Sequence, residues 1–563
     1  MKKVILPTLL VMLFLSRSFM IAGETEITWY ASGSGGIVAA GPGASVRAGL
    51  GILNNQGNAV DAAVAVIFNL AVSDYGSFCI GGEVPFMYYS IKTGKVVVFN
   101  GMGGAPGDRS VIGRLYADGI PEDRDGIQLS TVPSAVSTLL AALELKGTMS
   151  FEQVIKPTLA LLDAGGEEWY GNLAKTFRRL IETEKNTKGT RGQKIRAARD
   201  RFYKGDIADE LNDYYIRSGA YLRKSDLVAH STTIEKPVSV KYRGYEIYKC
   251  NTWTQGPVLL QSLRLLEKFD LKSMGFFSAD YVHAVAESMK LAYADRDLYY
   301  GDPSFVKVPL KQLLSDKYTS LRFSIIDMKK ASNEIRPGDP YKMKAIIGPG
   351  QYWQGDHGTT TCAVIDRWGN AVAATPSSNG EYGICESLGI AHNTRMTSFN
   401  TQKGHPNSVQ PFKRPRITLT PTIVLKNGKP VMAISVAGGD MQDQVTLQLI
   451  LDNIEFGMKP KEALSSRRLY TYHTENSFNP SPDPKARIYK IGALDLYATD
   501  QEVINDLISR NHLVKVVPEP IAAPAMIYYD QATGICYAAT EPFYKRESPR
   551  GKYCGALEIS TDK

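Results

Sequence analysis

Apolar residues recur along this chain in patterns that predict both buried helices and short strands. Within residues 36–72, Asn58 is well placed to cap a helix whose Ala, Val and Ile residues are apolar nearly all round. Such a helix belongs in the interior of a large fold. Residues 279–303 predict another helix, with Val282 and Val285 on one face.

Strands are expected mostly in the last third of the chain. Residues 84–101 predict an earlier hairpin, with two strands joined at Thr93 and Gly94. Further apolar and β-prone runs predict strands at 359–366, 371–375, 417–425, 430–435, 525–529 and 534–540, and a helix at about 444–456. We therefore expect helical layers around a central antiparallel or mixed sheet, with no repeat of solenoid period.

The first 22 residues have the pattern of a signal peptide. Two lysines precede an apolar run from Val4 to Leu15, and small residues follow near Ala22. The run is too short and wrongly flanked for a stable membrane span, although a single uncleaved anchor is the alternative. We therefore expect a secreted or periplasmic protein whose mature chain has no membrane segment.

Composition and charge narrow the class of partner. With 44% hydrophobic and 22% charged residues, the chain is typical of a globular protein rather than a disordered or fibrous one. Removing Lys2, Lys3 and Arg17 with the signal peptide lowers the formal net charge from +8 to +5. That charge is modest for this length, so no nucleic acid partner is expected. The basic stretch at 175–201 contains interspersed acids, which is typical of a solvated helical face.

Cysteine and histidine patterns give no support to a metal site. The six cysteines are too sparse for a disulfide scaffold, although export would permit a bridge or two. Neither a CxxC nor an HExxH motif occurs, and the cysteines and histidines form no cluster. We therefore expect neither a metal nor a cofactor.

Three consecutive threonines in GDHGTTTCAVIDRWGN, residues 355–370, are candidates for nucleophilic chemistry. A threonine hydroxyl is a weak nucleophile, but an N-terminal threonine carries its own base, the α-amine, with an ordinary pKa of about 8. Gly358 is the least hindered residue whose carbonyl the Thr359 hydroxyl could attack to cut the chain. Geometry would permit either Thr359 or Thr360 as the nucleophile.

The threonine run also has a plainer interpretation. Threonine favours strands, and TTTCAVID followed by RWGN is typical of a hairpin. His357 could be mistaken for a general base, but it is more typical of a loop histidine. On the run alone, a hairpin strand is the better interpretation.

A pair of glycines, Gly438 and Gly439, lies between a predicted strand and a predicted helix. Paired glycines there can direct backbone N–H groups at an oxyanion, aided by the helix N-terminus. The alternative is a tight strand-to-helix turn that needs no Cβ atom.

Eight collinear blocks together resemble the γ-glutamyltransferase family of N-terminal nucleophile hydrolases. They span nearly the whole mature chain and are far more specific together than any one block. The blocks are GNAVDAAVA (57–65), GGEVPFMYY (81–89), STVPSAV (130–136), QGPVLLQSLRLLEKFDL (255–271), KLAYADRDLYYGDPSF (290–305), TTTCAVIDRWGNAVAATPSSN (359–379), KRPRITLTPTIV (413–424) and AGGDMQDQ (437–444).

This resemblance implies a precursor that cleaves itself into two chains. The implied fold is of the α+β class, a four-layer αββα unit built from a large subunit at 23–358 and a small subunit at 359–563. Thr359 would be the N-terminal nucleophile of the small subunit. Gly358 would then be the last residue of the large one.

Other site residues follow from the same resemblance. Ser377 and Asn379 stand where the family carries a hydroxyl residue and an asparagine near the nucleophile's amine, with Ser377 in place of the usual threonine. Gly438 and Gly439 match the family's oxyanion hole. Thr418 falls where transferases carry the second of two serines that hold the substrate carboxylate.

Departures from the transferase pattern indicate a subtype. Ile417 replaces the first of those two serines, and Met102 stands where transferases carry an arginine that grips the γ-glutamyl α-carboxylate. Arg395 and Ser398 replace acidic or amide residues that bind the α-amine. An arginine would repel an ammonium group and attract a carboxylate.

The segment at 399–413 is short where many transferases insert a lid. Together these departures resemble the acylase-like branch, which includes glutaryl-type cephalosporin acylases. We therefore expect a secreted, self-processing amidohydrolase that acts on a small-molecule amide through a threonyl ester, with acyl transfer as a further possibility. One alternative is a true γ-glutamyltransferase or glutathione hydrolase, and another is an inactive homologue with a binding or structural role.

Overall fold

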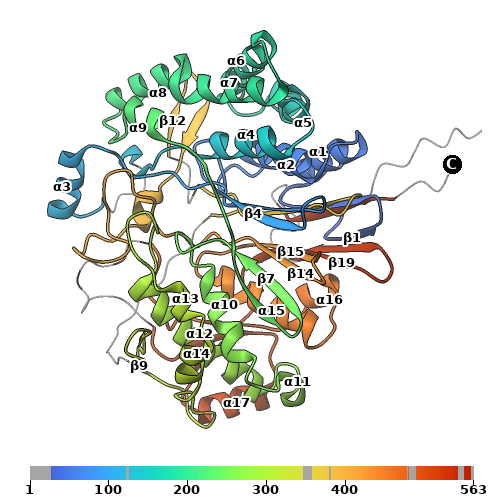
Figure 1. Ribbon diagram of the computed structural model, residues 1–563, viewed down its shortest axis with the longest axis vertical. Coiled ribbons are helices and arrows are strands. Elements are labelled where there is room, and N and C mark those ends of the chain that lie inside the picture. The colour runs from blue at the N-terminus through green and yellow to red at the C-terminus, as the bar shows by residue number, and fades with distance from the viewer. Residues whose placement is uncertain are drawn as a thin grey trace, which may run out of the picture.

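Two stacked β-sheets lie between two layers of helices (Figure 1). This computed structural model describes residues 27–121, 126–345, 358–378, 382–478, 480, 483, 490–542 and 551–558. The predicted signal peptide at 1–22, His357 and Asn379 lie outside the described residues. The layers confirm the predicted four-layer αββα fold.

The first sheet carries the threonine run. Its strands are all antiparallel to their neighbours, in the order β21 (Tyr553–Leu557), β2 (Gly36–Ala40), β10 (Cys362–Asp366), β11 (Ala371–Ala374), β3 (Phe86–Ser90), β4 (Lys95–Asn100) and β5 (Thr233–Glu235). It is covered by α1 (Gly43–Asn54), α2 (Ala59–Ser73), α4 (Ala135–Lys146) and α5 (Phe151–Asp163). As predicted, Asn58 caps α2 by accepting hydrogen bonds from backbone N–H groups, and the helix is almost wholly buried.

The second sheet carries the paired glycines. Its order, again antiparallel, is β1 (Tyr30–Gly33), β20 (Ile535–Thr540), β19 (Ala523–Asp530), β15 (Lys429–Ala437), β14 (Thr422–Lys426), β7 (Tyr245–Lys249) and β6 (Val238–Tyr242). Its outer face packs on α10 (Pro257–Leu266), α12 (Ala279–Tyr299) and α15 (Met441–Ile454). An apolar cluster fills the space between the sheets. Both sheets combine strands from before and after Gly358, so the two predicted subunits share one core.

Several predicted boundaries move for local reasons. Strand β14 begins at Thr422 instead of 417, because Pro421 has no N–H and the backbone of Ile417 instead bonds to Trp253 and Gln255. The three threonines precede β10 and are not part of the strand.

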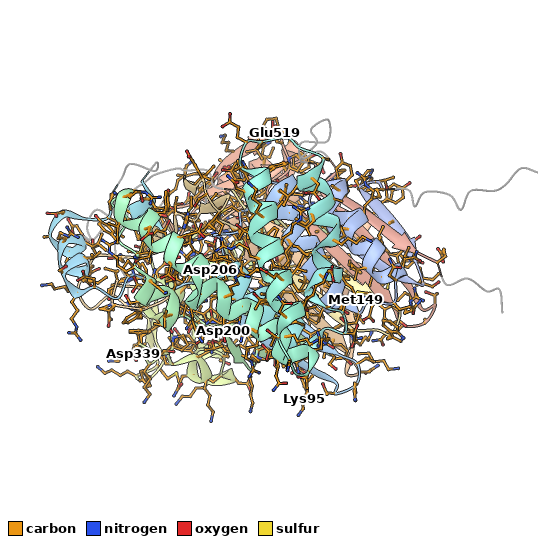
Figure 2. All side chains as sticks on the ribbon, turned by 90° about the horizontal axis from the view of Figure 1, so that it is seen from above. Lys95, Met149, Asp200, Asp206, Asp339 and Glu519 are labelled. Carbon is orange, nitrogen blue, oxygen red and sulfur yellow. The ribbon has the colours of Figure 1, made fainter. Side chains whose placement is uncertain are left out.

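The basic stretch lies on α6 (Tyr170–Asn186) and α7 (Arg191–Lys204), in the outer helical layer. Arg178 pairs with Asp163 at 2.6 Å and Arg201 with Asp206 at 2.9 Å. Figure 2 shows Asp206 on this outer layer. The stretch is thus the solvated helical face that its charge pattern predicts. Among the residues that the structure describes, no helix is long and apolar enough to cross a membrane.

Candidate active site

The threonine run lies at one end of the first sheet, where segments flanking three strands meet. Thr359 precedes β10, Ser377 follows β11 and Glu83 precedes β3. The backbone N–H of Glu83 donates to Ser377 O at 2.9 Å, and the Ser377 N–H donates back to Glu83 O at 3.1 Å. The Thr360 N–H donates to Pro376 O at 2.9 Å. Sheet pairing therefore fixes Ser377 beside Thr359.

The carbonyl oxygen of Gly358 accepts two hydroxyl hydrogen bonds. One comes from Thr359 Oγ1 and the other from Ser377 Oγ, each at 2.8 Å. The two hydroxyl oxygens are 3.3 Å apart, and Thr359 is only 5% exposed. Two donors on one carbonyl oxygen draw electrons from the carbon that Thr359 would attack. A Cβ atom on Gly358 would lie 2.7 Å from Gly76 O, so only glycine fits here.

Thr360 is engaged in a separate buried network. Its Oγ1 donates to Asp74 Oδ2 at 2.6 Å and accepts from Lys552 Nζ at 2.9 Å. Lys552 also pairs with Asp74 at 2.8 Å, and all three side chains are buried. Because the Thr360 proton and a lone pair are both used, the geometry favours Thr359 as the nucleophile.

The first of the paired glycines, Gly438, lines the same cavity as Thr359. Gly438 has φ +140° and Gly439 φ +55°, between β15 and α15, and within the described ranges their N–H groups donate to no partner. Thr359 and Gly438 both line a cavity of about 280 Å³. Unused N–H groups beside a hydroxyl nucleophile can hold the oxyanion of an acyl-transfer intermediate.

Sequence patterns gave no indication of the opposite wall of this cavity. It comes from a small sheet of β16 (Arg468–Thr471), β17 (Ala493–Tyr497) and β18 (Leu513–Val517). Asp495 and Glu519 contribute carboxylates to the lining. Tyr472 Oη donates to Asp495 Oδ2 at 3.0 Å, while burial raises the pKa of Asp495. Glu519 is exposed at an outer edge of the molecule (Figure 2), so the cavity reaches the surface there.

Arg395 lies behind Ser377 and away from solvent. Its side chain is 1% exposed, its Nε donates to Glu83 Oε1, and its Nη2 donates to Ser377 Oγ at 2.7 Å. Its Nη1 has no hydrogen-bond partner in the described part of the chain. Burial raises the pKa of Glu83 to about 7, although the Arg395 charge opposes the rise. Glu83, which sequence reasoning missed, lies within one of the eight blocks.

The remaining predicted substrate residues are buried around this centre but do not line the cavity. Thr418 and Ser398 are each 1% exposed, and their hydroxyls have no partner among the described residues. Met102 is fully buried, and its carbonyl oxygen accepts a hydrogen bond from Arg414 Nε at 2.9 Å. A guanidinium group therefore does lie beside Met102, from a residue that the sequence analysis did not single out.

The predicted short segment at 399–413 packs close to the body of the protein. The Ala105 N–H donates to Lys413 O at 2.8 Å, and Asn400 pairs with Ser408. Within the described residues, no group of three or more His, Cys, Asp or Glu side chains is arranged to hold a metal ion.

Comparison with known proteins identifies the family. The model of the gamma-glutamyltranspeptidase family matches residues 45–168 and 168–548. The chain belongs to the γ-glutamyltranspeptidase family. It is 32% identical over 483 residues to the glutathione hydrolase proenzyme of Escherichia coli K12, covering 77% of this chain and 80% of the relative.

Acylase relatives align with a larger share of this chain than the glutathione hydrolase does. The acylase ACY 1 proenzyme of Pseudomonas sp. strain SE83 is 29% identical over 539 residues, covering 88% of this chain and 90% of the relative. The crystal structure of cephalosporin acylase from Bacillus halodurans aligns with a TM-score of 0.76 at 25% identity, covering 97% of this chain and all of that one. The protein is thus a γ-glutamyltranspeptidase-family enzyme of the N-terminal nucleophile hydrolase type.

Proposed function

We propose that the chain is a precursor that cleaves itself between Gly358 and Thr359, and that Thr359 then hydrolyses an amide through a threonyl ester. The pair of hydroxyl hydrogen bonds on the Gly358 carbonyl oxygen carries this proposal. The Thr359 hydroxyl attacks that carbonyl carbon, and water releases the large subunit, 23–358, from the small subunit, 359–563.

In the processed enzyme, the freed α-amine of Thr359 acts as the base. It takes the hydroxyl proton as Thr359 attacks the substrate carbonyl and returns it to the leaving amine. The N–H groups of Gly438 and Gly439 hold the oxyanion, and water then cleaves the ester. The short segment at 399–413 leaves the site open to water. Hydrolysis of the ester is therefore faster than acyl transfer to an amine.

The proposed substrate is a small amide with an acyl group other than γ-glutamyl, processed outside the cytoplasm after removal of residues 1–22. Burial of Met102 and the extensive match to acylases support the acylase-like assignment. A γ-glutamyl substrate is the second candidate, because Arg414 places a cation beside Met102. Arg395, which contacts Ser377, is a further cation near the centre.

Two measurements test this function. Denaturing electrophoresis with N-terminal sequencing should give two chains, the smaller beginning at Thr359, and a single uncut chain would contradict self-processing. Rates on γ-glutamyl, glutaryl and plain acyl anilides should then favour the glutaryl or acyl compound. Faster cleavage of the γ-glutamyl anilide, lost in Arg414→Met, would establish the second candidate instead.

A further inference from the structure

A buried ion pair lies directly behind the bond proposed to break. Glu83 is 0% exposed and Arg395 1%, and the backbones of Glu83 and Ser377 are joined by two hydrogen bonds. Burying two charges costs several kcal/mol of desolvation, so such a pair is weak evidence for a purely stabilising role. Its position therefore calls for a chemical explanation.

The hydrogen bonds around Ser377 determine where its proton points. An arginine N–H can only donate, so Ser377 Oγ must accept from Arg395 Nη2 at 2.7 Å. The single hydroxyl proton of Ser377 can then be donated to Gly358 O at 2.8 Å, which is nearer than Thr359 Oγ1 at 3.3 Å. A hydroxyl that accepts from a cation becomes a stronger donor, because the charge polarises its O–H bond.

We propose that Arg395, held by Glu83, is a positioning residue for self-cleavage that keeps the Ser377 proton on the carbonyl oxygen of Gly358. This inference rests on the proposed function and differs from the substrate-binding role predicted for Arg395. Arg395 reaches the reaction only through Ser377. The guanidinium needs both partners, because Glu83 fixes its Nε while Nη2 contacts the serine.

The step assisted by this relay is an N-to-O acyl shift. Thr359 Oγ forms a bond to the Gly358 carbonyl carbon, and the bond from that carbon to the Thr359 nitrogen breaks. The hydroxyl proton ends on the departing nitrogen, which becomes the α-amine. Negative charge develops on Gly358 O in the intermediate, where the Ser377 O–H meets it. Water then hydrolyses the ester and leaves the Gly358 carboxylate.

Cell-free synthesis of the full chain, followed in time on denaturing gels, tests the relay. Arg395→Met should slow cleavage at least about tenfold, as expected for loss of a transition-state hydrogen bond of this kind. Arg395→Lys should restore part of the rate, because a lysine can reach one partner but not both. In a Ser377→Ala background, Arg395→Met should cause no further slowing, because Arg395 acts through the serine.

A matched variant separates the relay from general destabilisation. Arg336 forms a buried ion pair with Glu287 on α12 at 2.8 Å, and neither residue contacts Thr359 or Ser377 in the described structure. Arg336→Met should lower the thermal midpoint as Arg395→Met does, yet cleave at the wild-type rate. Equal slowing in both variants would overturn the proposal.

The remaining outcomes are also decisive. If wild type is cut at Thr359 and Arg395→Met is cut equally fast but has a raised KM for its anilide, Arg395 binds substrate and the relay is wrong. Additive slowing by Ser377→Ala and Arg395→Met would likewise contradict action through the serine. If wild type itself stays uncut, the proposed function fails, which is a distinct result.

Discussion

Two adjacent threonines, Thr359 and Thr360, each lie near a buried ion pair, but the contacts differ. On the Thr359 side, Arg395 and Glu83 contact Ser377, whose hydroxyl reaches the Gly358 carbonyl oxygen. On the Thr360 side, Lys552 and Asp74 contact the threonine hydroxyl directly. In the proposed mechanism the first pair acts on the bond between Gly358 and Thr359, whereas the second holds the Thr360 hydroxyl in place.

In the proposed mechanism, that difference accounts for the choice of Thr359 over Thr360 as the nucleophile. The Thr360 hydroxyl could attack only by giving up its bonds to two buried charges, which would leave both under-solvated. Among the described residues, the Thr359 hydroxyl contacts only neutral partners, at Gly358 and Ser377. A nucleophile without a charged partner loses least when it moves to the carbonyl carbon.

The largest predicted effect separates these two threonines. Thr359→Ala should abolish self-cleavage, because it removes the hydroxyl that attacks the Gly358 carbonyl carbon in the proposed mechanism. Thr360→Val should still be cut at Thr359, although more slowly, since Lys552 and Asp74 lose a shared partner. N-terminal sequencing of the products checks both variants. A Thr359→Ala chain cut normally, or cut at Thr360, would break the distinction.

Local signals explain why part of the fold and of the candidate site could be predicted from the sequence. The helix after Asn58 was predictable because its cap and its apolar surface are contained within neighbouring residues. Thr359 and Gly438 were singled out by the chemistry of their neighbours and by the resemblance. They flank strands of different sheets, Thr359 before β10 and Gly438 after β15, and their common cavity depends on the stacking of those sheets.

The ion pairs escaped prediction because their partners are distant in the chain. Glu83 and Arg395 are 312 residues apart, and Asp74 and Lys552 are 478 apart. No local period relates such residues, so only the tertiary fold brings them together. Arg395 departs from the family pattern in the sequence alone. Its contact with Ser377 depends on Glu83, which holds the guanidinium in place.

The next effect is on stability, on the Thr360 side. Lys552→Met should lower the free energy of unfolding by about 3–5 kcal/mol, because it leaves the Asp74 carboxylate buried without its cation. Urea denaturation of the precursor measures this loss. Adding Asp74→Asn should recover much of it by removing the unpaired charge. A loss that persists in the double variant would indicate that packing of the lysine stem matters more than its charge.

A smaller effect concerns the groups that stabilise the oxyanion. It separates those that act in substrate hydrolysis from those that act in self-cleavage. A Cβ on Gly438 would lie 2.9 Å from Ala522 Cβ, and its φ of +140° disfavours other residues. Gly438→Ala should therefore shift the N–H and lower kcat on an anilide about 100-fold. Self-cleavage should continue, since Ser377 serves the Gly358 carbonyl. Parallel loss of both activities would show that one set of donors serves both reactions.

The last expected effect is a pH dependence on the Thr359 side. Because burial raises the pKa of Glu83 from 4.5 to about 7, the folded protein binds a proton in this range that the unfolded chain releases. Stability should therefore fall as pH rises from 4.5 to 7 and level off above it. The contribution is up to about 3 kcal/mol.

Glu83→Gln isolates this contribution. The unfolding free energy of wild type minus that of the variant, from urea titrations at pH 5 and pH 8, removes the titration of all other groups. The difference should decrease with pH by up to about 3 kcal/mol. A flat difference would mean that Arg395 keeps Glu83 ionised throughout. The expected decrease would instead mean that ionising Glu83 beside Arg395 lowers the stability of the fold. Such perturbed pKa values are common at functional sites.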